Sequence, residues 1–172
     1  MPRPWSCWMT PTRSRRPPEA ASAAVALAVL ALAACSPTAP PGVNRDDLDA
    51  AISRAVGDPN TCVLIADARS GRVNYRYNTA TACAREWPAC DAAGARKLKD
   101  LLDATVKDRR PRALSCNTMA DGSRGVGWSA GPIAGTDLVY AAMMEGDRVF
   151  PGRMMSDRLE TAFRRAKVSK QP

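Results

Sequence analysis

Residues 62–66, which read Cys-Val-Leu-Ile-Ala, form the continuous apolar run on which the predicted fold depends. A strand that is apolar at every position is typical of the centre of a sheet that is covered on both faces. Residues 68–71, Ala-Arg-Ser-Gly, then predict a turn. Val73, Tyr75 and Tyr77 alternate with polar residues, which indicates a half-buried strand nearer an edge of the sheet. Together these segments predict a β-hairpin.

Three more strands are predicted in the second half of the chain, at residues 112–118, 126–131 and 138–144. Asp121-Gly122 supplies a turn between the first two. The strand at 138–144 is apolar throughout, so it is also expected at the centre of the sheet. If these five strands are numbered along the chain, a five-stranded antiparallel sheet in the order 2-1-5-4-3 places both apolar strands in its middle.

Three helices are predicted from apolar stripes with helical spacing. They cover residues 44–56, residues 91–107, and a final segment that begins near Asp157 with Glu160 in the capping-box position. We expect the first and last helices to pack together on one face of the sheet, with the middle helix as one further helix. This arrangement is an α+β fold. Residues 79–90 show neither helical nor strand periodicity in their apolar residues. This segment is therefore predicted to be a loop held by a disulfide.

An uncharged apolar run covers residues 21–35 and follows several arginines. A basic flank, a short apolar segment and small residues before a cleavage site are typical of a secretory signal. The run is shorter than the ~20 residues that a membrane-spanning helix needs. It ends in Leu-Ala-Ala-Cys at residues 32–35, which resembles the lipobox of bacterial lipoproteins.

The lipoprotein resemblance implies that the signal is removed before Cys35 and that Cys35 then carries lipid. An ordinary signal peptide with an incidental cysteine is the alternative. Ser36, in place of Asp, implies sorting to the outer membrane, with the domain on its periplasmic face. The expected organisation is a signal peptide (1–34), a lipidated tether (35–43), a single α+β domain (44–168) and a frayed tail (169–172).

The predicted domain contains four cysteines, Cys62, Cys83, Cys90 and Cys116. Four cysteines in an exported domain predict two disulfides. Cys62 opens the first strand of the hairpin and Cys83 follows its second strand, so the two come within bonding distance and Cys62–Cys83 is the first predicted pair. Cys90–Cys116 then follows by elimination. The rival pairing is Cys83–Cys90, a short loop closure.

The 172-residue chain has 25 Lys and Arg against 17 Asp and Glu, a net charge of +8. This balance suits a partner such as an anionic lipid surface or polymer, and nucleic acid is not expected outside the cytoplasm. The absence of histidine removes the commonest general base, and no Cys-x-x-Cys pair offers a zinc site. The sequence therefore predicts no catalytic, cofactor or metal site. The expected partners are the membrane, through lipid on Cys35, and an envelope protein or anionic polymer.

Residues 61–73 are similar to the first hairpin of penicillin-binding proteins and serine β-lactamases, and residues 127–131 with 137–144 resemble a later hairpin of that superfamily. That family's Ser-x-x-Lys motif, in which the lysine helps to activate the serine, is absent from residues 35–168. Lys-Thr-Gly is absent too, and Ser115-Cys116-Asn117 matches Ser-x-Asn in letters only. The resemblance implies a reduced relative with a regulatory or residual hydrolase role. A generic α+β domain, including profilin-like ones, is the alternative.

Two charged clusters suggest possible sites. The acidic cluster consists of Asp46, Asp47 and Asp49. It suits a helix N-terminal turn, with carboxylate catalysis as the alternative. The basic cluster consists of Arg109, Arg110 and Arg112. It predicts a solvated loop, or a site for an anionic glycan or lipid headgroup. The final helix has a cationic outer face of Arg158, Arg164, Arg165 and Lys167.

Glycines and tryptophans raise two further possibilities. The glycines that suggest a phosphate cradle by number are Gly122, Gly125, Gly127, Gly131 and Gly135. They lie between strands and do not open a helix, so the geometry of a cradle is not expected. Trp87 and Trp128 could form an exposed binding patch. We expect instead that one is in the core and that the other packs against the disulfide loop.

Overall fold

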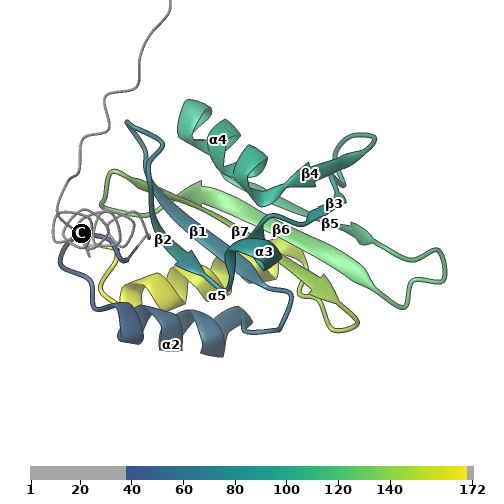
Figure 1. Cartoon of the computed structure of the whole chain (residues 1–172), viewed down its shortest axis with the longest axis horizontal. Coiled ribbons are helices and arrows are strands. Elements are labelled where there is room, and N and C mark those ends of the chain that lie inside the picture. The colour runs from purple at the N-terminus through teal and green to yellow at the C-terminus, as the bar shows by residue number, and fades with distance from the viewer. Residues whose placement is uncertain (1–37, 170–172) are drawn as a thin grey trace, which may run out of the picture. The chain divides into compact units, whose positions relative to one another are not determined.

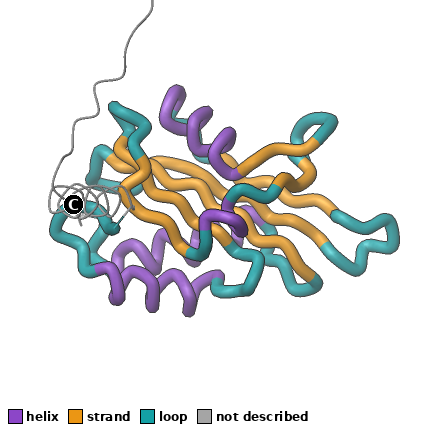
Figure 2. Tube along the Cα trace, viewed as in Figure 1, coloured by secondary structure: helices purple, strands orange, loops and turns teal. Residues whose placement is uncertain are grey.

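A computed structural model describes residues 38–169 (Figures 1 and 2). The predicted signal segment, Cys35 and the last three residues lie outside this range. The described helices are α2 (Arg45–Val56), α3 (Ala80–Cys83), α4 (Leu98–Asp108) and α5 (Gly152–Arg165). The described strands are β1 (Cys62–Asp67), β2 (Val73–Tyr77), β3 (Glu86–Pro88), β4 (Ala95–Lys97), β5 (Arg112–Asn117), β6 (Gly125–Pro132) and β7 (Leu138–Gly146).

Five strands form one antiparallel sheet in the order β2-β1-β7-β6-β5. The α+β class and the five-stranded antiparallel sheet are therefore confirmed. β1 and β7, the two strands that are apolar in sequence, pair directly, with Leu64 opposite Ala141. The strand numbers differ from the expected 2-1-5-4-3 because the chain also contains β3 and β4. Those two short strands form a separate two-stranded sheet that was not predicted.

α2 and α5 lie together on one face of the sheet (Figure 1). The core on this face combines Leu48 and Ile52 of α2, Met155 and Leu159 of α5, and sheet residues such as Ile65, all of them buried. The Asn44 side chain accepts a hydrogen bond from the backbone N–H of Asp47 at 3.1 Å and so caps α2.

α4 covers the opposite face (Figure 1), where Leu98, Leu101 and Leu102 pack with Leu64 and Trp128 in a second core. Side chains on a strand alternate between faces, and β1 serves both cores in this way. Val63 and Ile65 face α2 and α5, while Leu64 and Ala66 face α4. A continuous apolar sequence at β1 is the consequence of being covered on both faces.

The prediction for residues 79–97 is wrong in two respects. Residues 79–90 are not a plain loop, because they contain α3 and β3. The next helix begins at Leu98 rather than near Asp91, with the Asp100 carboxylate accepting from the backbone N–H of Lys97 at 3.0 Å. Cys90 and Gly94 have φ angles of 66° and 94°, which a helix does not allow, so residues 91–97 turn back to pair with β3.

The predicted start of the last helix is also wrong, since α5 begins at Gly152, five residues before Asp157. A Cβ atom at Gly152 would lie 2.3 Å from the Trp128 carbonyl oxygen and 2.5 Å from the Leu114 nitrogen. The backbone of the first turn therefore rests directly on β5 and β6. This tertiary contact, rather than a local capping signal, sets where the helix starts.

β6 is buried on both faces, because residues 125–131 are all covered. Val126 and Trp128 face α4. On the other face, Ser129 makes hydroxyl hydrogen bonds to Tyr140, at 2.9 Å, and to Ser156 of α5, at 2.8 Å. The small residues of this face let α5 approach the strand closely.

Two disulfides join the four predicted cysteines, as Cys62–Cys83 and Cys90–Cys116, with Cα–Cα distances of 5.3 and 5.5 Å. Both pairs are those predicted from the sequence, and the rival Cys83–Cys90 closure is not formed. The first bridge holds α3 against β1. The second bridge connects the segment after β3 to the edge strand β5.

Candidate functional site

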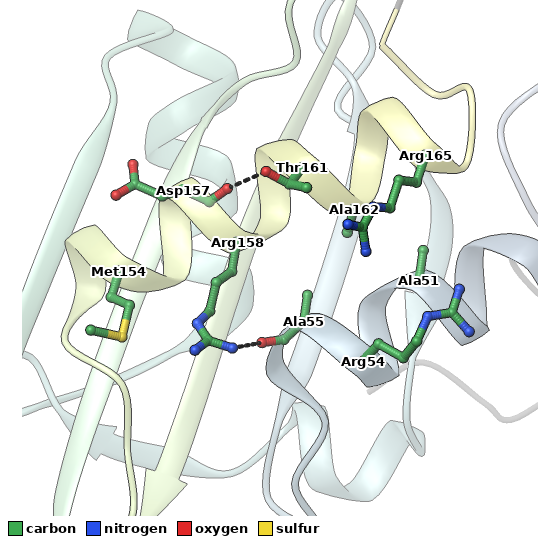
Figure 3. A pocket seen from close by; sticks show the side chains of 9 residues that line it. All are labelled: Ala51, Arg54, Ala55, Met154, Asp157, Arg158, Thr161, Ala162 and Arg165. Carbon is green, nitrogen blue, oxygen red and sulfur yellow. Dashed lines mark hydrogen bonds between the residues drawn. The ribbon is translucent and has the colours of Figure 1, made fainter.

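A groove of about 360 Å³ runs between α2 and α5 on the surface of the described domain (Figure 3). Its floor consists of Ala51 and Ala55, one turn apart on α2, and Ala162 on α5. Residues four apart on a helix share a face, so the two α2 methyl groups lie in line along the groove. Methyl groups are too short to fill the space between the two helices at the surface. The hollow is the result.

Two arginines from different helices lie at the same end of this groove. Arg54 projects from α2 and Arg165 from α5, with the Arg165 guanidinium turned toward Ala162 and that of Arg54 turned away from it (Figure 3). Among residues 38–169, neither side chain has an ion-pair or hydrogen-bond partner. Guanidinium groups donate in a rigid planar fork that matches a carboxylate or a phosphate. This end of the groove is therefore a place where an anion would be stabilised.

Arg158 has a different role, because its guanidinium is already engaged within the protein. It donates to the carbonyl oxygen of Ala55 at 3.2 Å, and its Cζ lies 4.1 Å from the centre of the Phe150 ring. Ala55 is in the last turn of α2, where carbonyl groups lack helical partners and where a cation is favourable. Arg158 thus bridges α5 to α2 across the groove.

Met154 and Asp157 line the groove toward the N-terminal end of α5 (Figure 3). The Met154 side chain is 44% exposed, which gives the groove a flexible apolar contact. Asp157 places a negative charge on the α5 side. The groove therefore has a cationic end at Arg54 and Arg165, a methyl-lined floor, and a mixed apolar and acidic end.

A second hollow, of about 290 Å³, lies beside the β5–β6 hairpin and is lined by residues that include Ser115, Asn117 and Arg124. Arg124 is not available to a ligand, because it donates to both carboxylate oxygens of Glu145 at 2.8 and 2.9 Å. The cationic side chain of this hollow is thus used within the fold. The groove between α2 and α5 is the better candidate.

The predicted acidic cluster does not form a site. Asp46 and Asp47 lie in the first turn of α2, as its N-terminal dipole favours. Asp49 instead accepts a hydrogen bond from the Tyr75 hydroxyl at 2.5 Å. Burial, together with this hydrogen bond, raises the pKa of Tyr75 above its usual value. The three carboxylates thus serve capping and packing roles.

The predicted basic cluster is divided between internal pairs. Arg112 lies on β5 and pairs with Asp108, whereas Arg109 ends α4 in the left-handed conformation and lies 4.0 Å from Asp137. Arg110 has no side-chain partner among the described residues. The three side chains therefore do not converge on one place.

The glycines and tryptophans are structural in the described domain. Three of the five glycines lie on β6, where a Cβ atom at Gly127 would come within 2.3 Å of the Phe150 carbonyl oxygen. Trp128 is fully buried and donates its indole N–H to the carbonyl oxygen of Pro88 at 2.9 Å. Trp87 is half-buried against the α4 core, as expected for a residue that packs near the second disulfide. They form no phosphate cradle and no aromatic patch.

Sequence reasoning did not select Arg54 or Arg165 as site residues. The sequence places both Arg158 and Arg165 on the outer face of the final helix, whereas Arg158 lies against α2. The available signal was the seven-residue spacing of Arg158 and Arg165, which places both on one stripe of α5 next to Ala162. The partner stripe of α2 could not be identified, because helix–helix contacts depend on the tertiary fold.

None of the described helices is long and apolar enough to cross a membrane. In the same range, no three His, Cys, Asp or Glu side chains come together as metal ligands. Comparison of the chain with protein-family models, curated proteins and solved structures finds no significant match.

Proposed function

We propose that this chain is a lipid-anchored protein of the bacterial cell envelope, held through lipid on Cys35, that binds another envelope protein and does not itself catalyse a reaction. Its proposed location is the periplasmic face of the outer membrane. The observation that carries the binding role is the groove between α2 and α5, which Arg54 and Arg165 line from opposite helices, neither with an ion-pair or hydrogen-bond partner among residues 38–169.

Two features support export and anchoring. The first is the Leu-Ala-Ala-Cys sequence at residues 32–35, followed by a Pro-, Thr- and Ala-rich stretch suited to a tether. The second is the pair of disulfides, which suits an oxidising compartment. Neither feature depends on the groove, so anchoring and binding can be tested separately.

In-cell photo-cross-linking tests the binding role. A benzophenone amino acid replaces Met154, which lines the groove, or Met119, which lies beyond β5 and is comparably exposed (44% and 51%). We expect a discrete protein adduct from position 154 and none from position 119. Equal adducts from both positions, or none from position 154, would contradict the proposed binding surface.

The alternative is a reduced relative of the penicillin-recognising serine hydrolases. Its support is the antiparallel sheet with its first and last helices together, and the position of Ser115 and Asn117 at the second hollow. Labelling the purified protein with a fluorescent penicillin separates the two functions. We expect no covalent adduct. An intact-mass increase of one acyl group that is lost in Ser115→Ala would favour the alternative.

A further inference from the structure

We infer that the groove between α2 and α5 binds an acidic peptide segment of the partner protein, with its carboxylates held by Arg54 and Arg165. This inference rests on the proposed binding function and names the chemistry of the partner. It follows from the charges in the groove, from its floor, and from the role of Arg158.

Two cations, Arg54 and Arg165, line the groove between α2 and α5. Arg54 and Arg165 have no carboxylate partner among residues 38–169. By contrast, Arg124 is paired with Glu145, and Arg112 with Asp108. An incoming carboxylate would accept hydrogen bonds from these guanidiniums without displacing an internal partner.

The floor favours a peptide over a polysaccharide. Ala55 offers a half-buried methyl group beside the buried Ala51 and Ala162, and Met154 adds a flexible apolar side chain, so the groove suits aliphatic side chains. Sugar rings usually bind against exposed aromatic faces. No aromatic residue lines the groove in the described domain, and the guanidinium of Arg158 covers the nearby Phe150 ring.

Arg158 and Asp157 set the direction of the segment. Arg158 is bound to the Ala55 carbonyl and to Phe150, so it is a positioning residue that holds the two helices together. Asp157, near Met154, repels a carboxylate. The acidic residues of the segment should therefore lie over Arg54 and Arg165, with apolar and basic residues toward Met154.

Fluorescence anisotropy with a defined peptide tests the inference. The protein is residues 36–172, a unit that contains both cores and both disulfides, so the assay does not depend on the lipid anchor. The probe is a fluorescein-labelled peptide, Glu-Ala-Glu-Leu-Ala-Leu-Lys, at low ionic strength. A second peptide has lysine in place of each glutamate and glutamate in place of the lysine.

The decisive variant is Arg54→Glu with Arg165→Glu. Its matched control is Lys107→Glu with Arg110→Glu, which changes the net charge equally near the end of α4, on the other face of the sheet. Ala55→Leu tests the floor, because a larger side chain at this half-buried position fills the groove without adding charge. Circular dichroism and thermal unfolding show whether each variant remains folded.

We expect the acidic peptide to bind wild type and the control variant equally. Binding should weaken at least about tenfold in the Arg54/Arg165 variant, the factor that corresponds to losing one charge-assisted hydrogen bond. Ala55→Leu should also weaken binding. Equal loss in the control variant, absence of binding to wild type, or tighter binding of polygalacturonate than of the peptide would each overturn the inference. If the protein binds the peptide but proves not to be lipid-anchored, only the lipoprotein proposal is contradicted.

Discussion

Arg124 and Glu145 form a two-pronged ion pair between partners of very different exposure. Glu145 is 2% exposed, whereas the Arg124 side chain is 42% exposed, and both carboxylate oxygens accept from the guanidinium. Glu145 also accepts from the Asn60 side chain at 3.0 Å. The pair thus connects β7 to the β5–β6 hairpin and to the loop after α2.

This asymmetry predicts unequal costs for removing either partner. Arg124→Leu leaves a carboxylate buried without its cation, so it should lower the free energy of unfolding more than Glu145→Leu does. Glu145→Leu leaves an arginine that can reach water, so it should cost only about 1 kcal/mol. Urea unfolding of both variants and of the double variant measures the difference. A larger loss for Glu145→Leu would contradict the assigned geometry.

Close backbone contact at Gly152 gives a second prediction. In Gly152→Ala, the new methyl group would meet the Trp128 carbonyl at 2.3 Å, and α5 would have to move away from the sheet. We expect a loss of about 2–3 kcal/mol, typical of overpacking. Gly146→Ala is the control, because its nearest contacts lie at 3.9 Å. Thermal unfolding should show a clear decrease in Tm for Gly152→Ala only, and similar values for the two variants would count against the contact.

The two disulfides should differ in their accessibility to reductant. Cys62 and Cys83 are buried, while Cys90 and Cys116 are half-buried. Limited reduction under native conditions, followed by alkylation and peptide mapping, should therefore modify Cys90 and Cys116 first. Loss of either bridge should cost about 2–4 kcal/mol of stability, because the unfolded chain becomes less restricted. Earlier alkylation of Cys62 would show that this order is wrong.

The Asp108–Arg112 pair predicts a pH dependence. Hydrogen bonding from the Arg112 side chain, helped by the Arg110 backbone N–H, lowers the pKa of Asp108 from 3.8 to about 2. A lowered carboxyl pKa contributes stability that is present above pH 3.8 and is lost as the pH falls through about 2.

An NMR titration of the Asp108 carboxyl should therefore give a midpoint near 2. Arg112→Leu should raise this pKa toward 3.8, whereas Arg110→Leu, which keeps the backbone N–H, should change it little. An unchanged Asp108 pKa in Arg112→Leu would exclude the hydrogen bond as the cause.

The main sheet was predictable because its signals are local and strong. The apolar run at β1, the alternation at β2 and the apolar run at β7 each report burial directly, and the Asn44 cap marks the start of α2. The hairpin geometry also placed Cys62 next to Cys83. Predicting these features requires only the periodicity of apolar side chains along the sequence and the length of the hairpin turn.

The errors lie where tertiary contacts override local preference. Residues 91–94 carry a capping Asp and two alanines, which favour a helix, yet the disulfide at Cys90 and the β3–β4 pairing hold them in a turn. Gly152 is a poor helix residue that starts α5 because only glycine fits against the sheet. The groove was missed for the same reason, since it exists only once α2 and α5 are brought together.

The lipid anchor is the most direct test of where this protein acts. Full-length chain should be expressed in a bacterium, extracted into detergent and examined by intact mass and by detergent-phase partition, beside Cys35→Ser. We predict that the mature N-terminus is Cys35 carrying lipid with two or more acyl chains, and that wild type enters the detergent phase, because two or more chains give stable anchoring. Wild type in the aqueous phase with an unmodified N-terminus would contradict the account.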